Sequence, residues 1–271
     1  MNLVRLICIS VGLVLIWQAI VLLTGVPPYI LPGPLSVAKA ALTHSGSLFD
    51  HAMTTLFEII AGLLLGTLLG ASSALSMIAS LSLKRWLLPV LVISQAIPVF
   101  ALAPLLVLWL GYGIGSKIAM AVLIIFFPVT AAFYDGLRST EPEWLELAQV
   151  MNAKPLAVIR HIRVPAALPA FASGLRVATA VAPIGAIVGE WVGSSKGLGF
   201  YMLHANARMQ IDIMFAALAV LAIVALTLYF LVDRAMIKIV YWQKDNGLAT
   251  PPAGRRGGQV RPKGTRERNE F

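Results

Sequence analysis

Long apolar runs, separated by short polar segments, constrain the fold of this chain more than any other feature of its sequence. Of 271 residues, 59% are hydrophobic and 12% are charged, about half the charged fraction of an ordinary soluble domain. One spanning helix needs about 20 mainly apolar residues, so the sequence predicts an all-α, polytopic membrane protein. We expect about six transmembrane helices, at roughly 6–23, 54–80, 86–110, 116–137, 168–191 and 213–232.

The first apolar run has a second interpretation, as a cleaved signal peptide, because Arg5 precedes its apolar core. No convincing small-x-small cleavage site follows before Pro27. The run also nearly reaches full spanning length, which favours a retained helix.

The distribution of Lys and Arg predicts the orientation of the chain in the membrane. If the N-terminus is cytoplasmic, 17 of the 21 basic residues fall on the cytoplasmic side, as the positive-inside rule requires. Both termini and the loop 138–165 should therefore face the cytosol. The basic residues, which give a net charge of +9, do not form a folded face with interleaved aromatics, so nucleic acid is not expected as a partner. The basic tail at 241–271 has almost nothing apolar to bury and is predicted to be disordered.

The loop 138–165 is charged, although apolar runs lie on both sides of it. Thr140 and Glu143 have the spacing of a capping box, which predicts a short helix that begins at Glu141. Asn152 should end this helix, because asparagine tolerates the left-handed conformation of a helix C-terminus.

A second short helix is expected to start at Pro155 and to end at Val164–Pro165, since proline suits a first helical turn and interrupts a helix interior. A helix–turn–helix of this kind in a cytoplasmic loop suggests a docking element for a cytosolic partner.

This loop resembles the EAA loop of inner-membrane permease subunits of ATP-binding-cassette (ABC) importers. The residues on the spacing of that motif are Glu146, Ala148, Asn152, Ile162, Val164 and Pro165. The chain departs from the motif in three places: Leu147 replaces the first alanine, Asn152 the glycine and Val164 the leucine. Asparagine preserves the backbone requirement of the turn, so docking should survive these changes.

The resemblance covers roughly 35–240 and includes several motifs in order. They are the segments 31–40, 95–117, 126–139 and 189–203. Together they are similar to the branch that serves nitrate, sulfonate, taurine and thiamin-precursor uptake, and within it to permeases for hydroxymethylpyrimidine-type thiamin precursors.

The resemblance implies the type I importer permease fold in a bacterial inner membrane. It divides the chain into an N-terminal helix with an external segment (1–53), a permease core (54–240) that contains the coupling loop 138–165, and the tail 241–271.

The implied partners are a second permease copy in a homodimer, a cytosolic ATPase dimer that binds ATP and Mg, and a periplasmic or lipid-anchored substrate-binding protein. The permease itself would be neither an enzyme nor a cofactor protein. Its implied coupling residues are Glu143, Glu146, Ala148, Asn152, Ile162 and Pro165.

Polar residues inside the expected spans are candidates for the substrate path, because a charge at mid-membrane costs about 2.5–3.5 kcal/mol on insertion scales. The candidates are Gln95, in a proline-disturbed span, and Glu190 with its neighbour Trp191. Glu190 could equally pair with a neighbouring helix, and Glu58 is expected to be structural. Trp191 could also belong to an interfacial aromatic belt.

Other function classes explain less of the sequence. The four histidines lack ligand spacing, no nucleophile and base form a catalytic set, and the glycine-rich segments 111–116 and 193–199 do not match a P-loop. A secondary transporter often shows interrupted repeats in both halves, and none is evident here. The glycines at 62, 66 and 70 have small-xxx-small spacing, which predicts close helix packing within the subunit or across a dimer.

Overall fold

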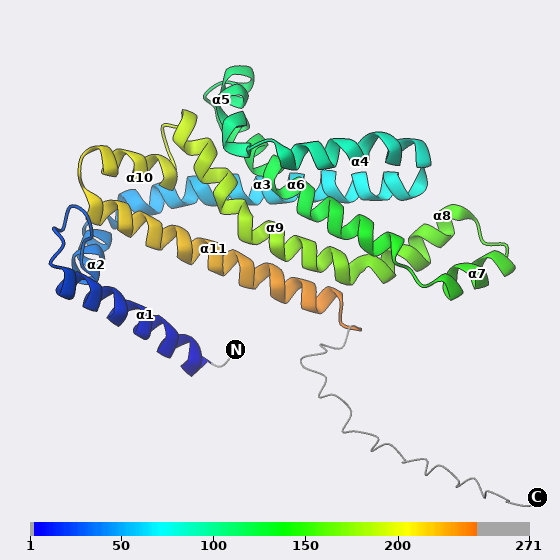
Figure 1. Ribbon diagram of the computed structural model, residues 1–271, viewed down its shortest axis with the longest axis horizontal. Coiled ribbons are helices and arrows are strands. Elements are labelled where there is room, and N and C mark those ends of the chain that lie inside the picture. Colours follow the sequence, from blue (N-terminus) through cyan, green and yellow to red (C-terminus); the bar gives the residue numbers. More distant parts are fainter. Residues whose placement is uncertain (1–2, 243–271) are drawn as a thin grey trace, which may run out of the picture. The chain divides into compact units, whose positions relative to one another are not determined.

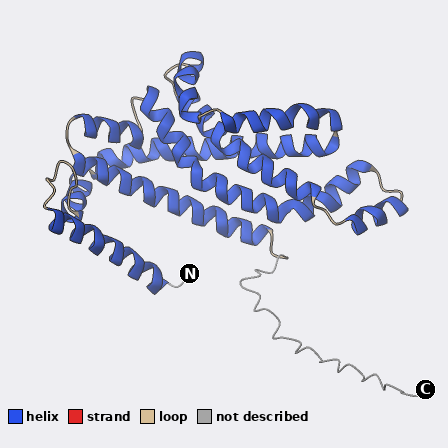
Figure 2. Ribbon diagram, in the orientation of Figure 1, coloured by secondary structure: helices blue, strands red, loops and turns tan. Residues whose placement is uncertain are grey.

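The computed structural model describes residues 3–242, and all regular structure among them is helical (Figures 1 and 2). This confirms the predicted all-α class. The predicted disordered tail lies, from residue 243 on, outside the described residues. The helices are α1 (Leu3–Thr24), α2 (Pro34–Thr43), α3 (Ser45–Ala79), α4 (Leu81–Ala96), α5 (Val99–Leu110), α6 (Ile114–Arg138), α7 (Pro142–Val150), α8 (Pro155–Val158), the π-helical turn η1 (Ile159–Arg163), α9 (Val164–Gly193), α10 (Leu198–Ala207) and α11 (Ile211–Ile239).

Among residues 3–242, four helical stretches are long and apolar enough to cross a membrane. They are α3, α6, the continuous run Pro155–Gly193 and α11. The pair α4 and α5 adds a fifth span if it is taken as one bent element, and the apolar helical stretch Val11–Thr24 of α1 is shorter. The helix predicted to start near residue 54 begins earlier, at Ser45.

The span predicted at 86–110 is not one straight helix. It breaks between Ala96 and Val99, and its two halves differ in direction by 105°. Ile97 has an extended backbone (φ −85°, ψ 123°), because the ring of Pro98 disfavours the helical conformation of the residue before it. Hydropathy does not contain this information, since the two helices taken together are apolar enough for one span.

Glycines allow the three central helices to approach closely. A Cβ at Gly66 of α3 would lie 2.7 Å from Ile125 Cγ2 of α6, and a Cβ at Gly185 of α9 would lie 2.8 Å from the Cα of Ala121. Gly70 likewise faces Val129 of α6. The small-xxx-small series therefore packs α3 against α6 within the subunit.

The two ends of the long helices carry different elements. Figure 1 shows α7 and α8 at one end and α2 and α10 at the other. At the α10 end, buried Val37, Leu198 and Ile213 join α2, α10 and α11 in one apolar cluster, and the ring of Trp17 stacks on Phe215 with centroids 5.8 Å apart. The predicted docking loop and the segment around Glu190 thus lie at opposite ends of the bundle.

Candidate functional site

The short helix α7 begins one residue later than the capping box predicts. Its N-cap is Glu141, without a side-chain cap, and Pro142 is its first residue. The Thr140 hydroxyl instead donates to the carbonyl of Leu137 at the end of α6 (3.2 Å). The capping-box prediction was wrong because the extended backbone that a proline imposes on its preceding residue makes Glu141 the N-cap.

Asn152 ends α7 in the left-handed conformation that the sequence predicts, with φ 55°. The Asn152 N–H donates to the Gln149 carbonyl and the Ala153 N–H donates to the Ala148 carbonyl, each at 2.9 Å. This pair of bonds is a Schellman motif, which satisfies carbonyls that a helix end leaves free. The turn between α7 and α8 is therefore fixed by its backbone.

We expect Asn152→Val to loosen this turn. A β-branched residue in the left-handed region costs about 1–2 kcal/mol, so the Ala153 amide should exchange its hydrogen about 5–30 times faster. Asn152→Gly, the matched control, should leave the exchange rate nearly unchanged. Equal exchange rates in both variants would show that the motif does not depend on this φ angle.

The second helix of the loop does not end at Val164–Pro165, as the sequence suggested, but continues into α9. The turn η1 has π-helical geometry, and the Val164 N–H donates to the Ile159 carbonyl, five residues back. Such a turn is wider than an α-helical turn. We attribute the continuity to this width, because Pro165 has no N–H and its ring would crowd the His161 carbonyl in a regular helix. Arg163 also donates to the Leu137 carbonyl (3.2 Å), which ties the turn to α6.

An apolar face of α7 is open to the surroundings. Val150 is 84% exposed, Met151 at the helix end 73%, and Trp144 and Leu147 are more than half exposed. In a helix these positions fall on one side. Ala148, in contrast, is 4% exposed and packs inside the chain. No sequence motif pointed to Trp144, Val150 or Met151, although positions 144, 147 and 151 have the spacing of one face of a helix.

The remaining predicted coupling residues differ in their exposure to solvent. Glu143 and Glu146 are exposed on α7, and Asn152 is exposed in the turn, while Ile162 and Pro165 are half-buried where η1 meets α9. The predicted docking residues therefore lie on α7, in the turn after it, in η1 and at the start of α9. We call the exposed residues Trp144, Leu147, Val150 and Met151 the α7 face.

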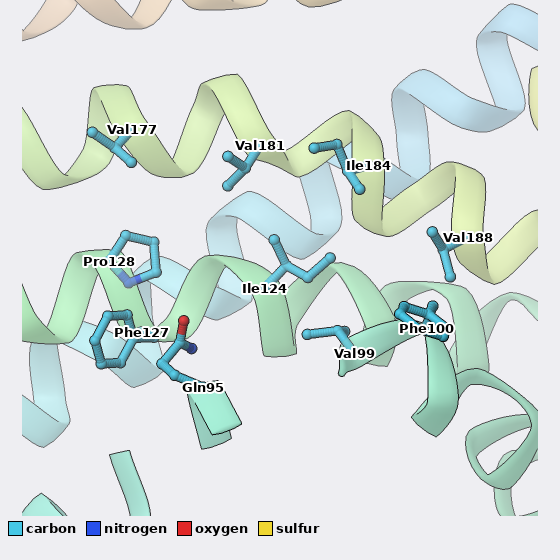
Figure 3. A pocket seen from close by; sticks show the side chains of 10 residues that line it. All are labelled: Gln95, Val99, Phe100, Ile124, Phe127, Pro128, Val177, Val181, Ile184 and Val188. Carbon is cyan, nitrogen blue, oxygen red and sulfur yellow. The ribbon is translucent and has the colours of Figure 1, made fainter. Parts of the chain in front are cut away.

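A cavity of about 500 Å³ lies beside the break between α4 and α5 (Figure 3). Its walls come from the two halves of the bent span and from the middle of α6 and α9. The lining residues are Gln95, Val99, Phe100, Ile124, Phe127, Pro128, Val177, Val181, Ile184 and Val188. Figure 3 shows the Gln95 amide beside the Phe127 ring, with Phe100 further along the same wall.

The structure separates Gln95 from the other two predicted path residues. Glu190 is 1% exposed and is not among the residues that line the cavity. Trp191 lines a different hollow of about 360 Å³, together with Met202, Leu203 and Met214.

Glu190 is held at the N-terminus of α10. Its Oε1 accepts a hydrogen bond from the Thr55 hydroxyl (2.6 Å), and its Oε2 accepts from the Gly199 N–H. The Thr55 oxygen in turn accepts from the Leu198 N–H (2.8 Å). Two N–H groups of the first turn of α10 thus have side-chain acceptors, so Glu190 and Thr55 together cap α10.

The same end of the bundle contains two further buried ionisable side chains. Lys117 is 3% exposed, and its Nζ donates to the carbonyls of Tyr112 (2.6 Å), Gly113 (2.8 Å) and Gly193 (2.7 Å). It thereby joins the turn after α5 to the C-terminus of α9. Glu58 is 1% exposed, and its Oε2 has no hydrogen-bond partner among the described residues.

Comparison with known proteins gives consistent matches along most of the chain. The family described as "Binding-protein-dependent transport system inner membrane component" matches residues 62–239. A probable ABC transporter permease protein from Haemophilus influenzae is 58% identical over 84% of this chain and 94% of its own length. The formylaminopyrimidine transport permease protein ThiX from Halalkalibacterium halodurans is 38% identical over 86% of this chain and 93% of its own.

A further relative and a solved structure also match the chain. A putative aliphatic sulfonates transport permease protein from Bacillus subtilis is 32% identical over 83% of this chain and 84% of its own. Among solved structures, the MetNI methionine ABC transporter in an inward-facing conformation matches with a TM-score of 0.57 and 19% identity, over 72% of this chain and 95% of that one. At this identity the structural match supports the fold.

Proposed function

We propose a mechanism for this chain from the premise that it belongs to the binding-protein-dependent transport system inner membrane components. Members of this family are permease subunits of ABC importers, so the chain is a transport component of the inner membrane and not an enzyme. Its partners are an ATPase and a substrate-binding protein. We further propose an orientation in the membrane, a docking face, a homodimer and a class of solute.

The observation that carries the mechanism is the α7 face. Four large apolar side chains are exposed at the end of the bundle opposite α10, and the basic residues concentrate toward the α7 end, which makes that end cytoplasmic by the positive-inside rule. An exposed apolar patch outside the membrane marks a protein interaction site. We propose that α7 docks in a groove of the cytosolic ATPase, with Glu143 and Glu146 at the edge of the contact.

The anchoring of the loop explains how docking would move the membrane helices. Arg163 and Thr140 both bind the Leu137 carbonyl at the end of α6, and η1 runs directly into α9. A displacement of α7 would therefore reach the two helices that form one side of the cavity. ATP and Mg, bound by the partner ATPase dimer, would supply the driving force, and alternating states of the permease would follow.

We propose that the cavity beside the α4–α5 break belongs to the translocation path of a homodimer. Non-helical backbone at membrane depth is tolerated where it is buried in protein or lines a water-filled cavity. The break at Ile97–Pro98 lies beside the cavity that Gln95 and Val99 help to line. The solute is a small organic molecule or anion. A thiamin pyrimidine precursor is the first candidate, in line with the formylaminopyrimidine permease. The alternative is a sulfonate, taurine or nitrate, in line with the sulfonate permease.

Purification from native membranes tests this function. A tagged full-length chain, extracted gently, should carry an ATPase at about one copy per permease, as a homodimeric permease on an ATPase dimer requires. Proteoliposomes of the complex with its binding protein should accumulate solute with MgATP and not with ADP. A permease recovered alone, with uptake that follows an ion gradient and not ATP, would contradict the proposal.

A further inference from the structure

The cavity beside the α4–α5 break has a chemical character that bears on its solute. It is lined by nine apolar residues and by Gln95, so its one polar side chain is an uncharged amide. The lining residues from α6 and α9, such as Ile124 and Val181, lie in the middle of helices that span the membrane. A charge without a partner at this depth is costly.

The described cations on the helices that wall the cavity are engaged elsewhere or lie at helix ends. Lys117 donates to three backbone carbonyls, and Arg176 pairs with Asp233 of α11 at 2.6 Å. Lys84 and Arg85 lie in the first turn and a half of α4, and Arg138 is the last residue of α6. An anionic solute would therefore pass the middle of the path without a counter-charge, and a second copy of the chain would repeat the same uncharged lining.

The polar and aromatic groups that are present suit a different solute. An amide both donates and accepts hydrogen bonds, so Gln95 can bind the edge of a heteroaromatic ring that carries both kinds of group. The rings of Phe100 and Phe127 offer faces for offset stacking on a planar solute. A volume of about 500 Å³ lies within the range of small-molecule sites.

We infer that the path admits an uncharged, planar heteroaromatic solute, which Gln95 binds at its edge, and disfavours sulfonate and nitrate anions. This inference rests on the proposed function, because it takes the cavity as part of the translocation path. It selects between the two substrate classes on the chemistry of this chain alone.

The test measures ATP-driven uptake by proteoliposomes that contain the whole complex and its binding protein. Hydroxymethylpyrimidine and riboflavin serve as uncharged probes, and ethanesulfonate and nitrate as anions. We expect MgATP-dependent uptake of at least one uncharged probe and none of the anions. Uptake of either anion at a rate equal to that of the uncharged probes, or uptake of neither uncharged probe, overturns the inference.

The binding protein also selects solutes, so a variant must test the cavity itself. Gln95→Leu keeps the size of the side chain but removes the amide, and should lower uptake of the uncharged probe by about 10-fold. Gln210→Leu, the same substitution at the N-cap of α11 and outside the cavity, should leave uptake unchanged. Co-purification of the ATPase and basal ATP hydrolysis verify that both variants assemble. Unchanged uptake in an assembled Gln95→Leu complex overturns the role of the cavity.

Failure of the proposed function has a separate signature. It would appear as loss of the ATPase on purification together with no ATP-driven uptake of any probe, charged or uncharged. Uptake of an anion by an assembled complex would leave the importer function standing and reject the substrate class.

Discussion

Leu147→Arg should reduce ATP-driven import by about 100-fold and leave insertion of the chain in the membrane unchanged. Leu147 is more than half exposed in the centre of the α7 face, with Trp144 and Met151 one turn to either side. In the proposed complex this face is desolvated against the ATPase. A charge buried there without a partner costs several kcal/mol, and about 2.8 kcal/mol corresponds to a 100-fold weaker association. The fold itself should not change, because the side chain does not pack inside the permease.

The measurement combines the yield of co-purified ATPase with uptake in proteoliposomes. Gln149→Arg is the matched control, since it places the same charge on the same helix. Gln149 is exposed and lies roughly opposite the α7 face by helix periodicity. Loss of ATPase with Leu147→Arg and retention with Gln149→Arg would support the docking face. Normal co-purification and import with Leu147→Arg would show that α7 docks through another side or does not dock.

Glu190→Ala should destabilise the end of the permease that carries α10 by about 2–4 kcal/mol. The substitution leaves the buried Gly199 N–H without its acceptor and leaves the Thr55 hydroxyl with only the longer bond to the His51 carbonyl (3.2 Å). An unsatisfied buried group costs about 1–3 kcal/mol, and the lost bond of Thr55 adds about 1 kcal/mol. For a chain of this size such a loss corresponds to a fall in melting temperature of about 4–16 °C.

The effect should be local enough to detect by proteolysis. Lys196 is exposed in the turn between α9 and α10, and Glu190 accepts a hydrogen bond from Gly199 directly after this turn. Trypsin should therefore cleave after Lys196 faster in Glu190→Ala than in the parent chain. Glu190→Gln, which keeps an acceptor oxygen and can donate to Thr55, should stay close to the parent in both assays. If Glu190→Ala kept its melting temperature and cleavage rate but lost import, Glu190 would act on the solute and not on α10.

The two roles predicted for Glu190 show where sequence reasoning stops. A carboxyl among apolar residues signals either a functional site or a paired buried group, and hydropathy does not distinguish them. The tertiary structure places Thr55, from 135 positions earlier in the chain, 2.6 Å from its Oε1. Lys117 likewise lies at the very start of the span predicted at 116–137, yet it is buried and its partners include Gly193, 76 positions away. Partners this far apart are set by helix packing alone.

The predicted docking loop also has some features that follow from the local sequence and others that depend on the tertiary structure. The left-handed turn at Asn152 follows from local chemistry, because asparagine tolerates that conformation, and the structure has it. The end predicted at Pro165 does not occur, because a π-helical turn lets α9 begin there without a break. Ala148, expected in the contact with the ATPase, faces its own chain, while Leu147 beside it is exposed. Which side of α7 is open depends on how the loop folds back on α6 and α9.

The all-helical membrane class, most of the spans, the family resemblance and the position of the predicted docking loop could all be read from the amino-acid sequence. These features depend on composition, on apolar run length and on the local conformational preferences of proline and asparagine. Each of these properties involves only residues that are close together in the sequence. The folded chain was needed to know the 105° angle between α4 and α5, the uncharged lining of the cavity around Gln95 and the open side of α7. It also placed Glu190 and Lys117 as buried ties between helix ends. These features depend on which distant helices lie in contact, and the polarity of a single residue does not specify its partner in another helix.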